Sequence, residues 1–264
     1  MSPQNDFAKT LKSLHVPGNP LIVANVWDAI TARTVASLPA TQALATASYA
    51  VAAAAGLEDS ALTLEVNLAA IQAIGRVAAE FNKPLTADFQ DGFDDRLEEG
   101  IRAVIRAGAV GINLEDFGRE LGEKGDLYPV DVAQDRIRRA LKTAAEEGLP
   151  DFVINARTDA LVVGQTIDEA IARGKAYLEA GASNVFIWGG KERQGMRTAE
   201  VEKASKALGG RLNVSLKRIV PGGLTVKELR EIGVARISVG PQLMLRTQGA
   251  VAEEARRVLE GEGV

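Results

Sequence analysis

Three charged side chains close apolar, β-branched runs of this sequence. Asp88, Glu115 and Arg157 each stand at the end of such a run, in a chain of 264 residues with a formal net charge of −4. A charge in this position costs free energy unless it is paired or bound to a metal. All three are therefore candidates for chemistry. The simpler explanation of Arg157 is an ion pair with Glu115 or Asp159.

Asp88 and Glu115, joined by Asp59, could form an acidic set that would repel itself without a divalent cation. The chain has no Cys and one His, so the available ligands are oxygens, which favour Mg²⁺ or Mn²⁺ over Zn²⁺. The guanidinium of Arg157 can hold a carboxylate or phosphonate with two hydrogen bonds. Ser48, at the end of another apolar run, offers a hydroxyl to a second anionic group. These residues predict a small dianionic substrate, anchored at both ends, with a metal at its middle.

The composition excludes several classes of function. Without Cys there is no disulfide, thiolate metal site or Cys nucleophile. The mild acidity and the lack of a basic run argue against a nucleic-acid partner. No apolar stretch reaches the roughly 20 residues of a membrane span, and the polar segment from Met1 to Pro20 has no signal-peptide core. We therefore expect a cytoplasmic protein without a membrane partner, and we expect His15, the single histidine, on the surface.

Eight short apolar runs have the continuous pattern of strands buried on both faces. They are Pro20–Trp27, Ala43–Ser48, Pro84–Gln90, Gly111–Glu115, Phe152–Arg157, Asn184–Trp188, Leu212–Lys217 and Arg236–Gly240. Helical patterns lie between them, as in 61–81 and 166–180, and Gly108, Gly181 and Gly233 stand where helices would end. Eight βα units in about 250 residues predict an α/β fold, a single (β/α)8 TIM-type barrel domain over residues 1–264. An open, doubly wound sheet is the alternative.

Six short segments, in their order and spacing, resemble the isocitrate lyase/phosphoenolpyruvate mutase superfamily over nearly the whole chain. They are NVWDA (25–29), SY (48–49), GLEDS (56–60), ADFQDGF (87–93), GINLED (111–116) and NARTDA (155–160). Five of them follow or include the carboxyl end of a predicted strand, which is where barrels carry their chemistry. The resemblance therefore implies a barrel enzyme with its site at that rim.

The resemblance also implies a role for each matching residue. Asp88 would be the direct Mg²⁺ ligand, Glu115 would hold waters of the metal, and Asp59 would lie near it. The residues implied to contact substrate are Trp27, Ser48, Tyr49 through its backbone amide, Asp88 and Arg157. The chemistry shared by the superfamily is formation or use of a Mg²⁺-bound enolate of pyruvate or glyoxylate type. The metal and the arginine stabilise the negative charge that develops.

The sequence departs from the family pattern at three places. Gln90 stands where the family has the second Asp of an Asp-x-Asp pair in the metal site, so we expect weaker Mg²⁺ binding; alternatively, Gln90 turns away and bonds the backbone of the turn 91–95. The segment 117–126 lacks the Lys-Lys-Cys-Gly-His loop of the isocitrate and methylisocitrate lyases and the Lys-x-Asn pattern of the mutase. Trp188 stands where some members have a His.

The leading interpretation is a Mg²⁺-dependent lyase or decarboxylase that cleaves a carbon–carbon bond of a small 2-oxo or 2-hydroxy dicarboxylate. Arg157 and Glu115 would act at the reacting centre, and the proton would come from metal-bound water, Tyr49 or a loop residue such as Lys124. Phosphorus–carbon chemistry, as in phosphonopyruvate hydrolase, and a non-catalytic binder of 2-oxo acids are the alternatives. The amphipathic stretch 241–261 is expected to pack on the barrel. In the family the last helix is often exchanged between subunits, which implies a dimer or tetramer.

Overall fold

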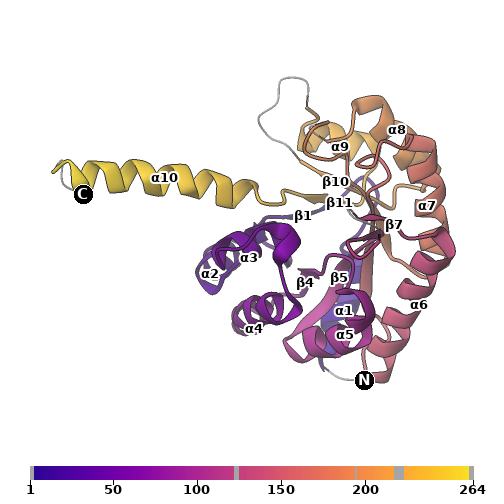
Figure 1. The fold of residues 1–264 in the computed structure, drawn as a ribbon, viewed down its shortest axis with the longest axis horizontal. Coiled ribbons are helices and arrows are strands. Elements are labelled where there is room, and N and C mark those ends of the chain that lie inside the picture. Colours follow the sequence, from indigo (N-terminus) through magenta and orange to yellow (C-terminus); the bar gives the residue numbers. More distant parts are fainter. Residues whose placement is uncertain (1–2, 122–124, 194, 217–222, 262–264) are drawn as a thin grey trace.

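The strands of the computed structural model form a parallel sheet that closes on itself (Figure 1). Residues 3–121, 125–193, 195–216 and 223–261 are described. The strands of this sheet are β1 (Leu21–Val23), β2 (Asn25–Val26), β3 (Leu44–Thr46), β4 (Leu85–Asp88), β5 (Ala109–Glu115), β8 (Val153–Thr158), β9 (Asn184–Ile187), β10 (Leu212–Ser215) and β11 (Arg236–Ser238). Their order is β1-β11-β10-β9-β8-β5-β4-β3-β2. Because β1 and β2 are successive pieces of one stretch, the sheet ends meet. The predicted (β/α)8 barrel is confirmed, and the open sheet is wrong.

Helices cover the outside of this barrel. They are α2 (Ala29–Ala36), α3 (Ser48–Ala54), α4 (Leu64–Glu80), α5 (Leu97–Arg106), α6 (Val130–Glu146), α7 (Ile167–Glu179), α8 (Thr198–Ala207) and α9 (Val226–Ile232), with short 3₁₀ turns at Asp59–Ala61 and Asp94–Arg96. A small antiparallel hairpin of β6 (Phe117–Gly118) and β7 (Asp126–Leu127) follows β5. The expected helix ends are confirmed, since Gly108, Gly181 and Gly233 all have positive φ angles, which glycine adopts without steric cost.

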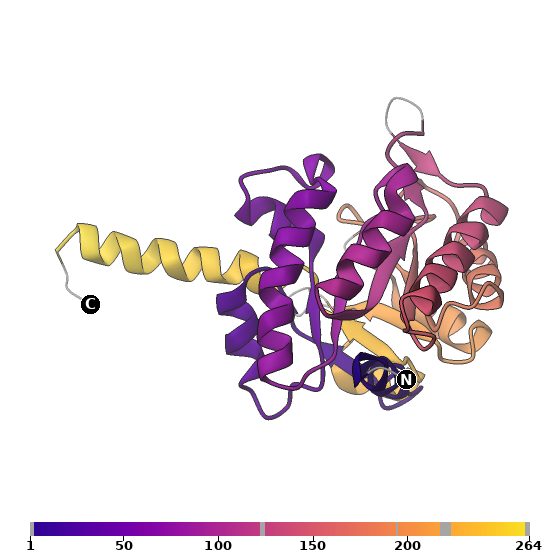
Figure 2. The same cartoon turned by 90° about the horizontal axis from the view of Figure 1, so that it is seen from below.

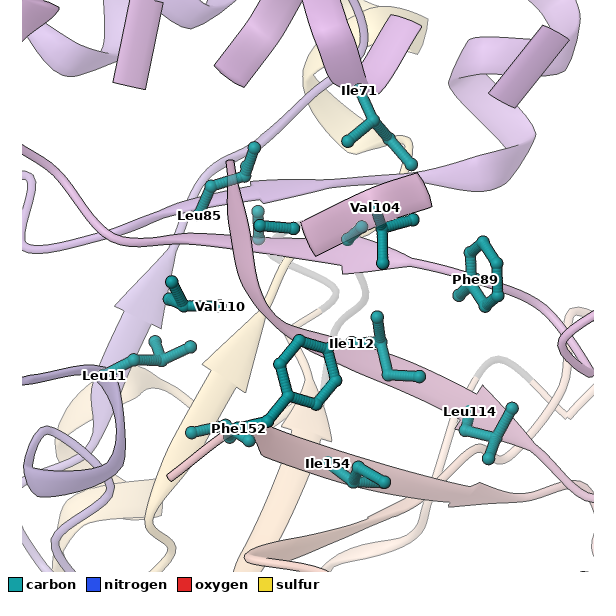
Figure 3. Close-up of a cluster of buried hydrophobic side chains, with 14 of the residues drawn as sticks. Leu11, Ile71, Leu85, Phe89, Val104, Val110, Ile112, Leu114, Phe152 and Ile154 are labelled. Atoms are coloured by element: carbon teal, nitrogen blue, oxygen red, sulfur yellow. The ribbon is translucent and has the colours of Figure 1, made fainter. Parts of the chain in front are cut away.

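The outer faces of the strands pack against the helices. Along β5, Ile112 and Leu114 face outward, and Figure 3 shows them in one buried cluster with Val104 of α5. Successive side chains of a strand point to opposite faces, so Asn113 and Glu115 face the barrel interior. The same alternation places Glu115 at the carboxyl rim, where the sequence analysis expects the site.

The middle of the barrel interior is polar. Asn113, Asn155 and Asn184 lie side by side in register on β5, β8 and β9. Asn155 Nδ2 donates to Asn113 Oδ1 at 2.8 Å, and Asn184 Nδ2 donates to Asn155 Oδ1 at 3.0 Å. Buried amides joined in this way satisfy one another and fix their orientations. They separate the carboxyl rim from the opposite, amino end of the barrel.

Helix α1 (Pro3–Ser13) closes that amino end. Its Leu11 is fully buried, and a Cβ added to Gly111 of β5 would lie 3.0 Å from Leu11 Cδ2, so a glycine here makes room for the helix. His15 follows α1, and its Nδ1–H donates to the Leu11 carbonyl at 2.8 Å. Burial lowers the pKa of His15 to about 3. His15 is half-buried, with its Nε2 out of contact with solvent, so the expected surface position holds only in part, because this polar segment folds back beneath the barrel.

Helix α10 (Gln242–Leu259) leaves the barrel and projects away from it, as Figures 1 and 2 show from two directions. In the described part of the chain, Met244 is the one buried residue of α10, whereas Leu245, Val251 and Leu259 are exposed. The expectation that this stretch packs on its own barrel is wrong, because most of its apolar side chains extend beyond the barrel surface.

Within the described ranges, no helix is both long enough and apolar enough to cross a bilayer.

Candidate active site at the carboxyl rim

Residues predicted for the site stand at the rim formed by the carboxyl ends of the parallel strands. Trp27 follows β2, Ser48 opens α3 soon after β3, and Asp88 ends β4. Glu115 ends β5 and is paired in register with Arg157 of β8. The local cause is the same for all five, because each stands at or just after the carboxyl end of an apolar strand and is thereby brought to the rim.

Asp88 is held in place by its neighbours. Its Oδ2 accepts a hydrogen bond from the Ser48 backbone N–H at 3.0 Å, and its own N–H donates to Thr46 Oγ1 at 2.7 Å. Asn67 Nδ2 donates to its carbonyl oxygen at 3.1 Å. Its Oδ1 is buried and has no hydrogen-bond partner among the residues that the structure describes. A buried carboxylate oxygen without a partner costs free energy, so we expect a ligand from outside the chain to bind this atom.

Gln90 links the rim to the loop after β5. Its Nε2 donates to Asp59 at the side-chain Oδ1 and at the carbonyl oxygen, both at 3.0 Å, while its Oε1 accepts from Arg119 Nη1 at 2.8 Å. Arg119 Nη2 also lies 3.6 Å from Asp59 Oδ2. The Gln90 side chain therefore faces Asp59 and Arg119, and its amide does not bond the turn 91–95. Its backbone adopts φ 49°, which is uncommon for a residue with a side chain.

Arg157 is oriented from three sides. Its Nη1 lies 2.9 Å from Glu115 Oε1, and its Nε and Nη2 donate to the two carboxylate oxygens of Asp159 at 2.8 and 2.9 Å. The face of the guanidinium stacks on Trp188, with 4.2 Å between the central carbon and the ring centre. A bidentate carboxylate and an aromatic face fix both the plane and the rotation of an arginine. The remaining N–H groups of Nη1 and Nη2 are the donors that a substrate could use.

The carboxylates of Glu115 and Asp159 are buried, and that of Asp59 is partly buried. Burial raises the pKa of Asp59, of Glu115 and of Asp159, because the charged form loses hydration. The charge of Asp88 raises all three further, whereas Arg157 lowers them without reversing the direction. The four carboxylates of Asp59, Asp88, Glu115 and Asp159 therefore outnumber the two arginines beside them, Arg119 and Arg157, and a bound cation would relieve the repulsion.

Trp27 and Tyr49 flank this cluster at the mouth. Trp27 packs against Ala47 and Met244, which makes it part of the wall. Tyr49 stands next to the buried Ser48 at the start of α3, and its side chain is 42% exposed. The structure thus brings both residues to the rim, while their contacts with a substrate stay predictions.

The residues present fit a Mg²⁺ ion better than a metal that needs many protein ligands. Within the described ranges, no three or more Asp, Glu or His side chains converge closely enough to hold a metal alone. Mg²⁺ usually keeps several waters and takes one or two carboxylates. The unpartnered Oδ1 of Asp88 could serve as the direct ligand. Asp59, Glu115 and the amide of Gln90 could then face metal waters.

Sequence reasoning missed two neighbours of the site. Arg119 lies in a loop without periodicity, so no pattern placed it against Gln90 and Asp59. Trp188 was noted as the residue at the end of a strand, but its stacking on Arg157 depends on the register of β8 with β9. Lys124, the expected loop acid, lies outside the described residues.

The fold is thus a parallel (β/α)8 barrel whose carboxyl rim gathers several carboxylates and an oriented arginine. The chain belongs to the phosphoenolpyruvate phosphomutase family, whose sequence model matches residues 11–259. The resemblance found in the sequence is thereby confirmed.

Two relatives illustrate the similarity. An uncharacterized protein of Mycobacterium tuberculosis is 28% identical over 252 residues, which cover 94% of this chain and 88% of that protein. The 2-methylisocitrate lyase of Escherichia coli is 37% identical over 120 residues, which cover 43% of this chain and 39% of that enzyme.

Solved structures agree with the fold. A candidate phosphonomutase from Burkholderia cenocepacia matches with a TM-score of 0.84 and 35% identity, covering 96% of this chain and 99% of that one. A phosphonopyruvate hydrolase bound to oxalate and Mg²⁺ matches with a TM-score of 0.84 and 23% identity, covering 97% and 88%. The named relatives of this chain thus include a lyase, a hydrolase and a mutase.

Proposed function

We propose that this protein is a Mg²⁺-dependent lyase or decarboxylase that cleaves a carbon–carbon bond of a small 2-oxo or 2-hydroxy dicarboxylate. The observation that carries the proposal is the buried, unpartnered Oδ1 of Asp88, as judged over the described residues, beside an uncompensated carboxylate cluster and an oriented arginine. The Mg²⁺ seen in a related hydrolase supports the choice of metal, with Mn²⁺ as a substitute.

In this proposal each residue has a separate task. Asp88 would hold the metal, and the position of Asp88 is fixed by its hydrogen bonds with Ser48 N–H and Thr46 Oγ1. Asp59 and Glu115 would accept hydrogen bonds from waters of the metal, and Gln90 would offer an amide oxygen or N–H without charge. A bound Mg²⁺ would supply positive charge to the substrate oxygen on which negative charge develops as the bond breaks.

Arg157 binds the anionic oxygens of the substrate next to the reacting centre. Glu115 and Asp159 hold it in one orientation before the substrate arrives, so little reorganisation is needed as charge develops. The Ser48 hydroxyl and the Tyr49 backbone N–H clamp the distal carboxylate, and Trp27 forms the wall beside it. Tyr49, whose ring is partly exposed, is our candidate for delivering the proton.

The test is a product assay with three substrates. The protein is incubated with Mg²⁺ and oxaloacetate, phosphonopyruvate or 2-methylisocitrate, and pyruvate, phosphate and succinate are measured against enzyme-free tubes, which correct for spontaneous decarboxylation. Pyruvate from oxaloacetate, or pyruvate with succinate from the tricarboxylate 2-methylisocitrate, would mean carbon–carbon cleavage and support the proposal. Phosphate from phosphonopyruvate would instead indicate phosphorus–carbon chemistry. Oxalate binding with no product in any tube would indicate a non-catalytic binder.

The metal assignment is tested by Asp88→Asn against a matched control. Asp28 comes two residues after β2 ends, also on the carboxyl side of the sheet, but it caps α2 by accepting from Thr31 N–H at 2.7 Å, a task that Asn performs equally well. Asp88→Asn should abolish turnover and the rise in melting temperature caused by Mg²⁺, whereas Asp28→Asn should retain both. Wild-type Mg²⁺ stabilisation in Asp88→Asn would refute the assignment of the ligand.

The projecting α10 supports a homo-oligomer of a single-domain barrel, a dimer or tetramer in which α10 lies on a partner. Leu245 and Val251 of α10 are exposed apolar side chains that a partner subunit would bury. Ile22 of β1 and Ile30 of α2 are exposed apolar residues on the barrel that could contact the α10 of a partner. The compartment we propose is the cytoplasm.

A further inference from the structure

Arg236 is a buried cation that the rim site does not use. It opens β11 and is paired in register with Leu21 of β1 and Asn213 of β10. The next residue, Ile237, belongs to the apolar cluster that includes Leu229 of α9, so it faces the helices. Arg236 therefore faces the opposite way, into the barrel, where its exposure is 1%.

Hydrogen-bond donors around Arg236 lack acceptors. Its Nε and Nη1 are buried and have no partner in the part of the chain that the structure describes, and the same is true of Asn213 Nδ2. The Asn213 amide is oriented by Ser238, whose Oγ donates to Asn213 Oδ1 at 2.9 Å. The amide oxygen of Asn213 therefore has a partner, whereas its amide nitrogen lacks an acceptor among the described residues. Two neighbouring strands thus present three buried nitrogen donors to the same interior.

The charge of Arg236 is also uncompensated. Burial lowers its pKa to about 10, so the guanidinium stays protonated near neutral pH. His15, the titratable group beneath it, has a pKa lowered to about 3 and is neutral there. Asp88 attracts Arg236 from the rim, but no described carboxylate forms an ion pair with it. An isolated charge in a protein interior costs several kcal/mol even after relaxation.

We propose that a chloride-sized monovalent anion binds inside the barrel, on the amino side of the rim site, held by Arg236 Nε and Nη1 and by Asn213 Nδ2. Water could occupy these donors, but it could not neutralise the guanidinium. A spherical anion accepts from donors on two strands without the fixed geometry that a carboxylate requires. The unpartnered acceptor Asn184 Oδ1 would be satisfied by water rather than by the anion. This site is independent of the proposed function.

Crystals of the wild-type protein grown in sodium bromide test the site directly. Bromide scatters anomalously, so it can be distinguished from water at the same position. We expect an anomalous peak in contact with Arg236 and Asn213. Water alone at that position, with no anomalous peak, would overturn the proposal.

Thermal unfolding tests it in solution. Melting temperatures are compared in sodium chloride and sodium gluconate at equal ionic strength, because an anion that binds the folded state raises the melting temperature with its concentration. The wild type should gain stability in chloride, and Arg236→Met and the still polar Arg236→Gln should lose that gain. Arg211→Met, which removes an exposed arginine just before β10, should keep it. An equal chloride effect in all four proteins would refute the site.

Discussion

Replacing Gln90 with Glu tests whether this residue faces the metal position. The two side chains have the same shape, so Oε1 can still accept from Arg119 Nη1, now 2.8 Å away. The change puts a carboxylate oxygen where Nε2 now donates to Asp59 Oδ1 and to the Asp59 carbonyl, each at 3.0 Å. Two attractive contacts therefore become repulsive ones at the centre of the carboxylate cluster.

The size of the effect follows from the distances. Two unit charges roughly 4 Å apart interact by about 4 kcal/mol at an effective dielectric constant near 20, which is a ceiling. Arg119, 3.6 Å from the Asp59 carboxylate, offsets part of this repulsion. We expect Gln90→Glu to lose about 1–2 kcal/mol without metal, a modest fraction of that ceiling, because the partners Asp59 and Arg119 are partly exposed and solvent screens their charges. At about 2–4 °C per kcal/mol, this lowers the melting temperature by several degrees.

Mg²⁺ should reverse the penalty, because a cation between the carboxylates turns their repulsion into attraction. The affinity of Gln90→Glu for Mg²⁺ should rise by a factor of about 5–30, the equivalent of 1–2 kcal/mol. Calorimetric titration of Mg²⁺ and melting curves with and without Mg²⁺ measure both effects. Gln72→Glu, on the exposed face of α4, is the control for added charge. If Mg²⁺ binds wild type, Gln90→Glu and Gln72→Glu equally well, Gln90 does not face the metal.

Three further predictions concern Arg157 at the rim, His15 at the amino end of the barrel, and helix α10. Arg157→Lys keeps the positive charge but loses the planar guanidinium that can make two parallel hydrogen bonds, so the binding free energy of oxalate should weaken by about 1–3 kcal/mol. A lower melting temperature with unchanged oxalate affinity would mean that Arg157 is purely structural. The pKa of His15 is lowered to about 3, so its contribution to stability is complete above its ordinary value of 6.5 and is lost as the pH falls towards 3. His15→Gln should therefore lose less stability than wild type between pH 6.5 and 4, and parallel melting curves would contradict this. Deletion of residues 242–264 should convert an oligomer to a monomer in light scattering, and an unchanged mass would exclude α10 from the interface.

Several features of the site could be predicted from the sequence because they depend on local pattern. An apolar run followed by a polar residue identifies a strand and its end, and parallel strands bring those ends to one rim. That reasoning placed Asp88, Glu115 and Arg157 in one region, and Arg157 does pair with Glu115 at 2.9 Å. It also gave the barrel, since repeated βα units of similar length leave few other closed arrangements.

The features that could not be predicted depend on contacts between distant segments. Gln90 faces Asp59 rather than its own turn because its backbone is left-handed and Arg119 reaches it from a loop. His15 is half-buried because α1 folds beneath strands that come almost a hundred residues later in the chain. Neither arrangement leaves a periodic trace in the sequence.

The sequence by itself determined which residue types reach the rim, and hence that a metal bound there would find oxygen ligands, with Arg157 beside them. Only the tertiary structure decided which of their atoms are already bonded and which are free. The same strand alternation that predicts Asp88 at the rim cannot show that Ser48 occupies one of its oxygens and leaves the other. Nor could it show that Arg236 has no counter-ion within the described chain. Side-chain partners are set by the three-dimensional packing of segments that are far apart in sequence, whereas periodicity records only which face of its own element a residue occupies.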